Sequence, residues 1–159
     1  MPRRTLGVLL ITITLSGCGT QTDPAKEAAE RELEAKNVAA MQIGLLSAAL
    51  DAYKTSVGEF PSTKQGLQAL RVRPADLPRT KRWEGSYLTS QGGLLSVKMD
   101  MLTDPWGHPY QYRSPGTHKP DSFDVWSCGP DGVNGSEDDI GNWNAPSLSD
   151  MLNPDERGK

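Results

Sequence analysis

The sequence has few cysteines, few aromatic residues and no cluster of positive charge, and each shortage excludes a class of protein. Its two cysteines are Cys18 and Cys128; Cys18 closes a segment with the pattern of a signal peptide, so we expect no disulfide framework. Aromatic residues make up 6% of the 159 residues, and the net charge is −3. Because nucleic-acid binding requires clustered lysine and arginine, which the part after Cys18 lacks, we expect no nucleic-acid partner.

Long apolar runs are also missing from the sequence. The run at residues 6–15 is about half as long as the roughly 20 residues that a membrane-spanning helix requires. It follows two arginines, and its last residue begins the tetrapeptide Leu15-Ser16-Gly17-Cys18, which resembles a bacterial lipobox. We therefore predict that residues 1–17 are a lipoprotein signal peptide and that Cys18 is lipidated, which would anchor the protein in the cell envelope, at the periplasmic face of a bacterial membrane. The alternative is an ordinary secretory signal with an incidental cysteine.

A long helix is predicted to follow the polar residues after Cys18. Asp23 and Pro24 have the pattern of an N-cap and a first helical position, and Gly58 is suited to closing the helix. Residues 25–35 are mostly charged or alanine, which is typical of a solvent-exposed stalk. Farther along, apolar residues recur every three or four positions, and we expect this face to pack against a head domain. The face consists of Ile43, Leu46, Leu50 and Tyr53, with Val38, Met41 and Leu45 beside them.

The rest of the chain is predicted to contain a second short helix and a small sheet. Residues 64–70 follow a capping serine or threonine and are expected to be helical. Residues 110–112 and 123–127 alternate apolar and polar side chains, as the two strands of an antiparallel hairpin do. Weaker extended patterns occur at residues 86–88 and 94–97.

The organisation that follows is a single α+β domain between an anchor and a tail. Three tryptophans are expected to be large pieces of its small core: Trp106, Trp126 and Trp143. Proline, serine, asparagine and charge dominate the end of the chain, which is typical of a disordered tail. The predicted boundaries are the signal peptide at 1–17, the lipid anchor and polar stalk at 18–37, the domain at 38–143 and the tail at 144–159.

Acidic side chains are concentrated in the loop after the last predicted strand, at Asp131, Asp138 and Asp139. Carboxylates brought within about 4 Å repel each other by roughly 4 kcal/mol per pair at an effective dielectric near 20, so such a cluster requires a cation. Calcium fits because it takes six to eight oxygen ligands in flexible geometry. The spacing is not that of an EF-hand, however. On the residues alone, a tight turn at Asp131 with a solvated acidic patch at residues 137–139 stays open.

No catalytic constellation is recognisable in the sequence. His108 and His118 lie in loops without a nearby nucleophile motif or paired metal spacing. Cys128 ends a strand-like run, where a buried and unreactive thiol is expected. An envelope hydrolase that uses a pair of acids is the remaining catalytic alternative. We therefore expect a protein that is not an enzyme and has no small-molecule substrate.

Several motifs occur in a fixed order along the chain, at residues 49–54, 58–70, 104–110, 129–132 and 138–143. In this order and spacing they resemble the major pseudopilin, protein G, of type II secretion systems. The resemblance covers residues 38–143 and implies a long helix packed on a small antiparallel sheet, with a calcium ion in the loop after the last main strand. It implies that the ligands are the side chains of Asp131, Asp138 and Asp139 and the backbone carbonyls of Cys128 and Val133.

Members of that family polymerise into a short periplasmic filament that helps to move folded proteins across the outer membrane. The resemblance therefore implies other pseudopilins or secretion-system proteins as partners. Such pseudopilins begin with a prepilin-peptidase site and a long apolar helix, whereas here Cys18 is followed by the polar residues 25–35. Two hypotheses follow: a calcium-stabilised structural protein of type II secretion tethered by Cys18, or an envelope lipoprotein binding module that reuses the head without entering a filament.

Overall fold

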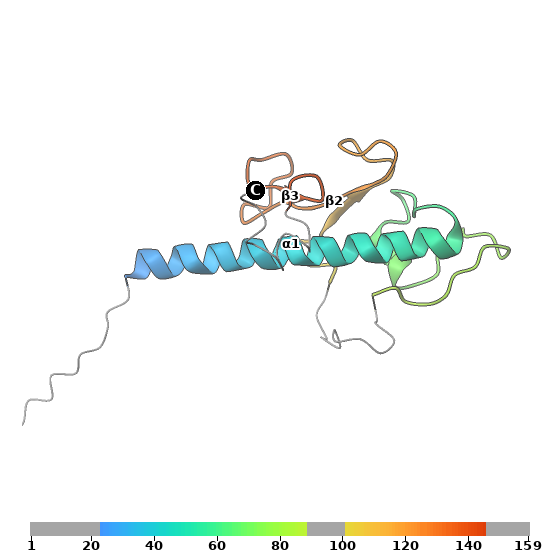
Figure 1. Cartoon of the computed structure of the whole chain (residues 1–159), viewed down its shortest axis with the longest axis horizontal. Helices are drawn as coiled ribbons and strands as arrows, with labels where there is room; N and C mark the ends of the chain where they lie inside the picture. Colours follow the sequence, from blue (N-terminus) through green and yellow to red (C-terminus); the bar gives the residue numbers. More distant parts are fainter. Residues whose placement is uncertain (1–22, 89–100, 146–159) are drawn as a thin grey trace, which may run out of the picture.

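A computed structural model describes residues 23–88 and 101–145 of the chain. One long helix runs the length of this part, and a small sheet and several loops lie along its second half (Figure 1). Cys18, the weak strand pattern at residues 94–97 and residues 146–159 of the predicted tail lie outside the described residues. The elements are α1 (Pro24–Val57), the 3-10 helix η1 (Leu67–Leu70), β1 (Gln111–Arg113), β2 (Asp124–Ser127) and β3 (Ile140–Gly141).

Helix α1 begins and ends where the sequence predicts. The Asp23 side chain accepts a hydrogen bond from the Ala25 amide, and Pro24 occupies the first helical position. At the other end Gly58 has a φ of 96°, and its amide donates to the Lys54 carbonyl at 2.7 Å. Both caps satisfy backbone groups that a helix end leaves unpaired, so the bounds follow from local chemistry.

The two halves of α1 have different surroundings. The first half is exposed and carries ion pairs four residues apart, such as Glu27 with Arg31 and Glu32 with Lys36. Burial begins at Ala39 and continues on the predicted apolar face. The prediction was wrong for Met41, which is 38% exposed. Met41 lies two residues from the buried Ile43, and two residues turn a helix by about 200°, so the two side chains point in opposite directions.

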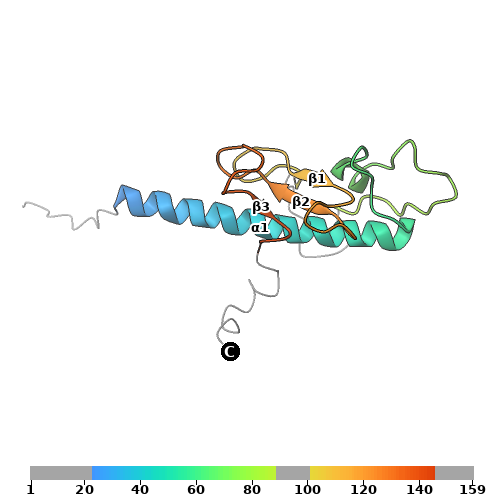
Figure 2. The same cartoon turned by 90° about the horizontal axis from the view of Figure 1, so that it is seen from above.

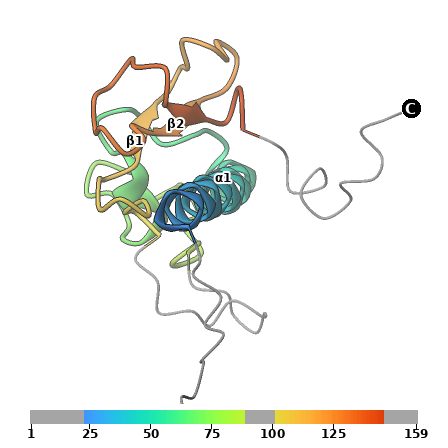
Figure 3. The same ribbon diagram turned by 90° about the vertical axis from the view of Figure 1, so that its left-hand side faces the viewer.

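The three strands form one antiparallel sheet in the order β1-β2-β3. The sheet lies on one side of α1, as the two turned views show (Figures 2 and 3), and α1 packs against β2 and β3. The first two strands match the predicted hairpin to within one residue, whereas β3 was not predicted. Residues 86–88 were expected to be extended, but they are not in a strand, and the predicted helix at 64–70 is helical only in η1.

The core between α1 and the sheet is built of aliphatic side chains with a few tyrosine and phenylalanine rings. Its central members are Leu46, Leu50, Tyr53, Leu70, Phe123 and Val125. The prediction that the three tryptophans fill this core was wrong, because Trp106, Trp126 and Trp143 are only half-buried. Trp126 directly follows Val125 in β2, and successive side chains of a strand point to opposite faces, so Val125 faces α1 and Trp126 faces away.

Candidate metal site

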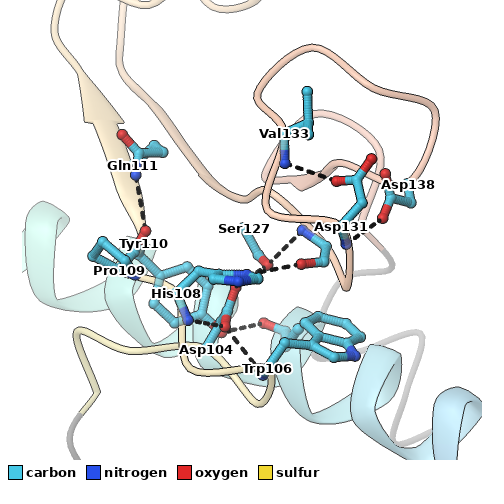
Figure 4. A network of polar contacts seen from close by, with 12 residues as sticks. Asp104, Trp106, His108, Pro109, Tyr110, Gln111, Ser127, Asp131, Val133 and Asp138 are labelled. Atoms are coloured by element: carbon cyan, nitrogen blue, oxygen red, sulfur yellow. Dashed lines mark hydrogen bonds and ion pairs between the residues drawn. The ribbon is translucent and has the colours of Figure 1, made fainter.

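The acidic residues lie in one loop that leaves β2 and returns to β3. Gly129, Gly132 and Gly135 have φ values of 64°, 67° and 90°, a conformation that side chains disfavour, and they let the loop turn three times in a short distance. Figure 4 shows the loop above the base formed by Asp104 and His108. These turns place Asp131 in the same compact loop as Asp138 and Asp139, which follow it by seven and eight residues.

Asp131, Asp138 and Val133 meet at one hydroxyl group. The Ser136 Oγ lies 2.9 Å from the Val133 carbonyl oxygen, 2.5 Å from Asp138 Oδ1 and 3.4 Å from Asp131 Oδ1. The hydrogen bond from Ser136 is also the main cause that holds the pKa of Asp138 below its ordinary value. Three of the five predicted ligands therefore point to a common position, which is occupied by the hydroxyl of Ser136, a residue outside the predicted ligand set.

Backbone amides of the loop bind the same carboxylates. Asp131 Oδ1 accepts from the Val133 amide at 2.8 Å, and Asp138 Oδ2 accepts from the Asp131 amide at 3.3 Å. Asp138 also packs against Gly129 so closely that a Cβ atom at that glycine would overlap its carboxylate. These contacts fold the loop around its acids.

Asp139 is the predicted ligand with an unsatisfied atom. Its Oδ2 accepts from the Gly135 amide at 2.8 Å, whereas its Oδ1 is buried and has no hydrogen-bond partner among the described residues. A buried carboxylate oxygen without a donor is costly, so this oxygen is suited to binding a cation or a water molecule. The oxygen-rich donor set of the loop is of the kind that calcium prefers.

The three predicted carboxylate ligands do not converge on a single point. In residues 23–88 and 101–145, no group of three or more His, Cys, Asp or Glu side chains is placed so that it could hold a metal ion. Asp131 and Asp138 come together, while Asp139 is turned toward Gly135. Cys128 lies at the start of the loop with a buried side chain, as predicted, and this burial, followed by the charge of Asp139, raises the pKa of its thiol.

A buried polar network supports the loop from below. The Asp104 side chain is fully buried and accepts hydrogen bonds from the His108 amide and from the Ser127 hydroxyl. The middle of the loop is tied to β2 by the Trp126 indole, which donates to the Asn134 side chain at 2.8 Å. The roles of Asp104 and Ser127 could not be predicted from the sequence, where the only signal was the motif at residues 104–110 that contributes to the family resemblance.

A second carboxylate, outside the acidic loop, organises the connection between β1 and β2. Asp124 accepts hydrogen bonds from the amides of Thr117, His118 and Lys119 and lies 3.1 Å from His118 Nδ1. Burial raises the pKa of Asp124, but the hydrogen bonds from His118 and Thr117 outweigh it, so the pKa lies below its ordinary value. The His118 ring stacks on Trp143, with 3.8 Å between ring centroids. Both histidines that were predicted to lie in loops therefore contact groups that hold the fold together: His108 contacts the Gly129 carbonyl, and His118 contacts Asp124 and Trp143.

Comparisons with known proteins agree on one family. The family model described as type II secretion system (T2SS), protein G, matches residues 28–143. Core protein G of the type II secretion system of Pseudomonas aeruginosa is 44% identical over 109 residues, which cover 67% of this chain and 69% of that protein. The corresponding protein of Klebsiella pneumoniae is 40% identical over 119 residues, which cover 74% of this chain and 73% of the relative.

A solved structure has the same fold. The crystal structure of the major pseudopilin from the type 2 secretion system of enterohaemorrhagic Escherichia coli superposes with a TM-score of 0.60 at 30% identity, over 76% of this chain and 92% of that one. The long helix packed on a small antiparallel sheet is thus the pseudopilin architecture, as expected. No helix in residues 23–88 or 101–145 is long and apolar enough to cross a membrane. By its sequence and its fold, the chain belongs to the protein G family of type II secretion systems, a family of structural pseudopilins and not a known class of enzyme.

Proposed function

We propose that this protein is a calcium-stabilised structural component of type II protein secretion that is tethered to the membrane by a lipidated Cys18. The observation that carries the calcium proposal is the buried, unpartnered Oδ1 atom of Asp139, in the same loop in which Asp131 and Asp138 meet at the Ser136 hydroxyl. A cation would give this atom the partner that the described residues do not supply. Family membership supports the secretion role.

The proposed ligand set combines three side chains with backbone oxygens. Asp131, Asp138 and Asp139 would supply carboxylates, and Cys128 and Val133 would supply carbonyls. Because the carboxylates now accept hydrogen bonds from amides of the loop itself, binding requires small rotations that turn them toward the ion. The ion supplies positive charge that offsets the repulsion between these acids.

The exposed first half of α1 supports the tether. From Pro24 to Val38, just before the first buried residue, the helix extends roughly 22 Å at 1.5 Å per residue. Its surface carries charged pairs, and Leu33 is 60% exposed. A solvated helix of this kind is suited to a spacer that keeps the head away from a lipid anchor at Cys18.

The same charged stretch supports the second candidate function. An envelope lipoprotein could use the head as a binding module without entering a filament, because the polar surface of residues 24–38 is well solvated on its own. The two functions differ in their partners. Recovery of other pseudopilins or secretion-system proteins on crosslinking in cells supports the filament-associated role, and their absence from the crosslinked products supports the separate module.

The calcium proposal is tested by thermal unfolding of the full chain in detergent, with chelator and with calcium. At a calcium concentration about 100 times the Kd, binding stabilises the folded state by about 2.7 kcal/mol, which raises the Tm by roughly 10 °C. Asp138→Ala should lose this rise, whereas Asp121→Ala, which removes an exposed acid outside the loop, should keep it. Equal behaviour of wild type and Asp138→Ala would contradict the site.

The tether is tested separately by mass analysis of the mature amino terminus. The proposal predicts that the mature chain begins at Cys18 and carries the mass of several acyl chains, because one chain alone binds a bilayer only marginally. Cys18→Ser should remove the added mass and release the protein from the membrane fraction. A mature terminus without acylation at Cys18 overturns the tether and leaves the calcium proposal untouched.

A further inference from the structure

We infer that Asp104, Ser127 and His108 form a brace that positions the first turn of the acidic loop and thereby sets its affinity for a cation. The second half of this inference, that the brace sets the affinity for a cation, rests on the proposed calcium site. The first half, that the brace holds the loop, rests on the contacts alone. Figure 4 shows the three side chains together below the loop.

The centre of the brace is the Asp104 carboxylate, whose side chain is 0% exposed. Its Oδ1 accepts hydrogen bonds from the amides of Trp106, at 3.1 Å, and His108, at 2.8 Å. Its Oδ2 accepts from the Ser127 hydroxyl at 2.5 Å. A buried carboxylate is stable only when such donors surround it, so Asp104 is fixed in one position by three groups.

Ser127 connects the fixed Asp104 carboxylate to the loop. Its Oγ donates to Asp104 and accepts from the Gly129 amide at 3.1 Å. Because the hydroxyl proton is used on Asp104, the lone pairs of the same oxygen are directed to the amide, which fixes the orientation of the peptide plane between Cys128 and Gly129. The carbonyl of that peptide belongs to Cys128, one of the proposed ligands.

His108 holds the same turn from the other side. Its Nδ1 lies 3.0 Å from the Gly129 carbonyl oxygen, so both backbone polar groups of Gly129 are bound by the brace. The imidazole also covers Gly132, where an added Cβ atom would lie 2.9 Å from the ring. The ring therefore limits the path of the chain immediately after Asp131.

Gly129 links the brace to Asp138, one of the proposed ligands. Asp138 packs directly on this glycine, since its carboxylate and its carbonyl lie where a Cβ atom would be. A shift of Gly129 would therefore move the surface against which Asp138 rests. Groups that orient metal ligands without touching the metal typically change its affinity by roughly 10-fold to 100-fold when they are removed.

Two variants of the full chain test this inference. Ser127→Ala removes the link from Asp104 to Gly129, and His108→Ala removes the outer contact. Because the His108 side chain is 37% exposed, its removal tests the brace even if the buried Ser127→Ala change prevents folding. The matched control is Tyr110→Phe, which deletes a buried hydrogen bond of 2.6 Å on the α1 side of the same segment and leaves the loop contacts in place.

The two readouts are hydrogen exchange of the amides of residues 129–139 with chelator present, and the Kd for calcium. We expect Ser127→Ala and His108→Ala to speed loop exchange and to weaken calcium binding by roughly 10-fold or more, while Tyr110→Phe lowers the Tm without either effect. If the two variants lower the Tm and keep wild-type exchange and affinity, the brace is only structural and the inference is overturned. If the wild type binds no calcium, the calcium proposal and the affinity half fail together, and the exchange rates alone decide the positioning half.

Discussion

The Tyr110 hydroxyl donates a hydrogen bond of 2.6 Å to the Gln42 side chain, and both residues are buried. Tyr110 directly precedes β1, while Gln42 lies on the face of α1 that contacts the head. The bond therefore joins segments 68 residues apart. Because a hydrogen bond between buried groups has a preferred direction, it fixes the rotation of α1 against the sheet in a way that apolar packing does not.

Loss of this bond should destabilise the head moderately. Tyr110→Phe keeps the ring and removes the donor from Gln42, so the free energy of unfolding should fall by about 1–2 kcal/mol. Urea unfolding measures this change. Gln68→Ala, at an exposed position of η1, should stay within about 0.5 kcal/mol of wild type. A Tyr110→Phe protein as stable as that control would show that the bond contributes nothing.

The apolar face of α1 gives a prediction with a control on the same helix. Leu50 is fully buried and Leu33 is 60% exposed. Leu50→Ala should cost about 2–5 kcal/mol through lost burial and the cavity left behind, whereas Leu33→Ala should change stability by less than about 0.5 kcal/mol. Chemical denaturation of both variants gives the comparison. Similar losses at the two positions would contradict the separation of α1 into a stalk and a packed half.

Alanine substitutions at two loop glycines can distinguish the cost of a strained backbone conformation from the cost of a close contact. Gly135 has a φ of 90° and open space around it, whereas Gly129 has a φ of 64° and lies against Asp138. Gly135→Ala should cost about 1–2 kcal/mol for the left-handed conformation alone. Gly129→Ala should cost more, because the Asp138 carboxylate must also move. Equal losses in thermal or urea unfolding would mean that the contact between Gly129 and Asp138 is unimportant.

Because of Asp124, the free energy of unfolding should fall at acid pH. Its pKa in the folded state lies below the ordinary value, so its contribution is present above the unfolded pKa of about 4 and is lost as the pH falls through the folded pKa. Asp124→Asn should therefore be less stable than wild type near neutral pH and should lose less stability below about pH 4. Asp121→Asn is the charge-matched control. Unfolding is measured at several pH values. If wild type and Asp124→Asn lose the same stability at acid pH, Asp124 is not a source of the pH dependence.

The sequence predicts best those features that local chemistry determines. Asp23 with Pro24 and the glycine at position 58 mark the ends of α1 to within a residue, because caps act within one turn of the helix. The hairpin of β1 and β2 is also readable, because alternation of side chains reflects one buried face. The acidic loop is recognisable from its composition and from the motifs around it.

Features that depend on distant contacts were missed or mistaken. Strand β3 has two residues and exists only through pairing with β2, so it has no pattern of its own. The tryptophans were expected in the core because of their size, but Trp126 is directed outward by its place in β2. Ser127 and Asp104 are small or charged residues whose roles appear only when the loop and the turn at residues 104–108 are brought together.

The calcium site is the central claim, and a calorimetric titration tests it most directly. Calcium is added to the metal-free full chain and to Asp139→Asn, which keeps the size of the side chain and removes its charge. We predict one ion bound per wild-type chain and binding weaker by roughly 10-fold or more in the variant, because the buried Oδ1 of Asp139 is a proposed ligand. No binding to the wild type, or the same affinity in both proteins, would contradict the account.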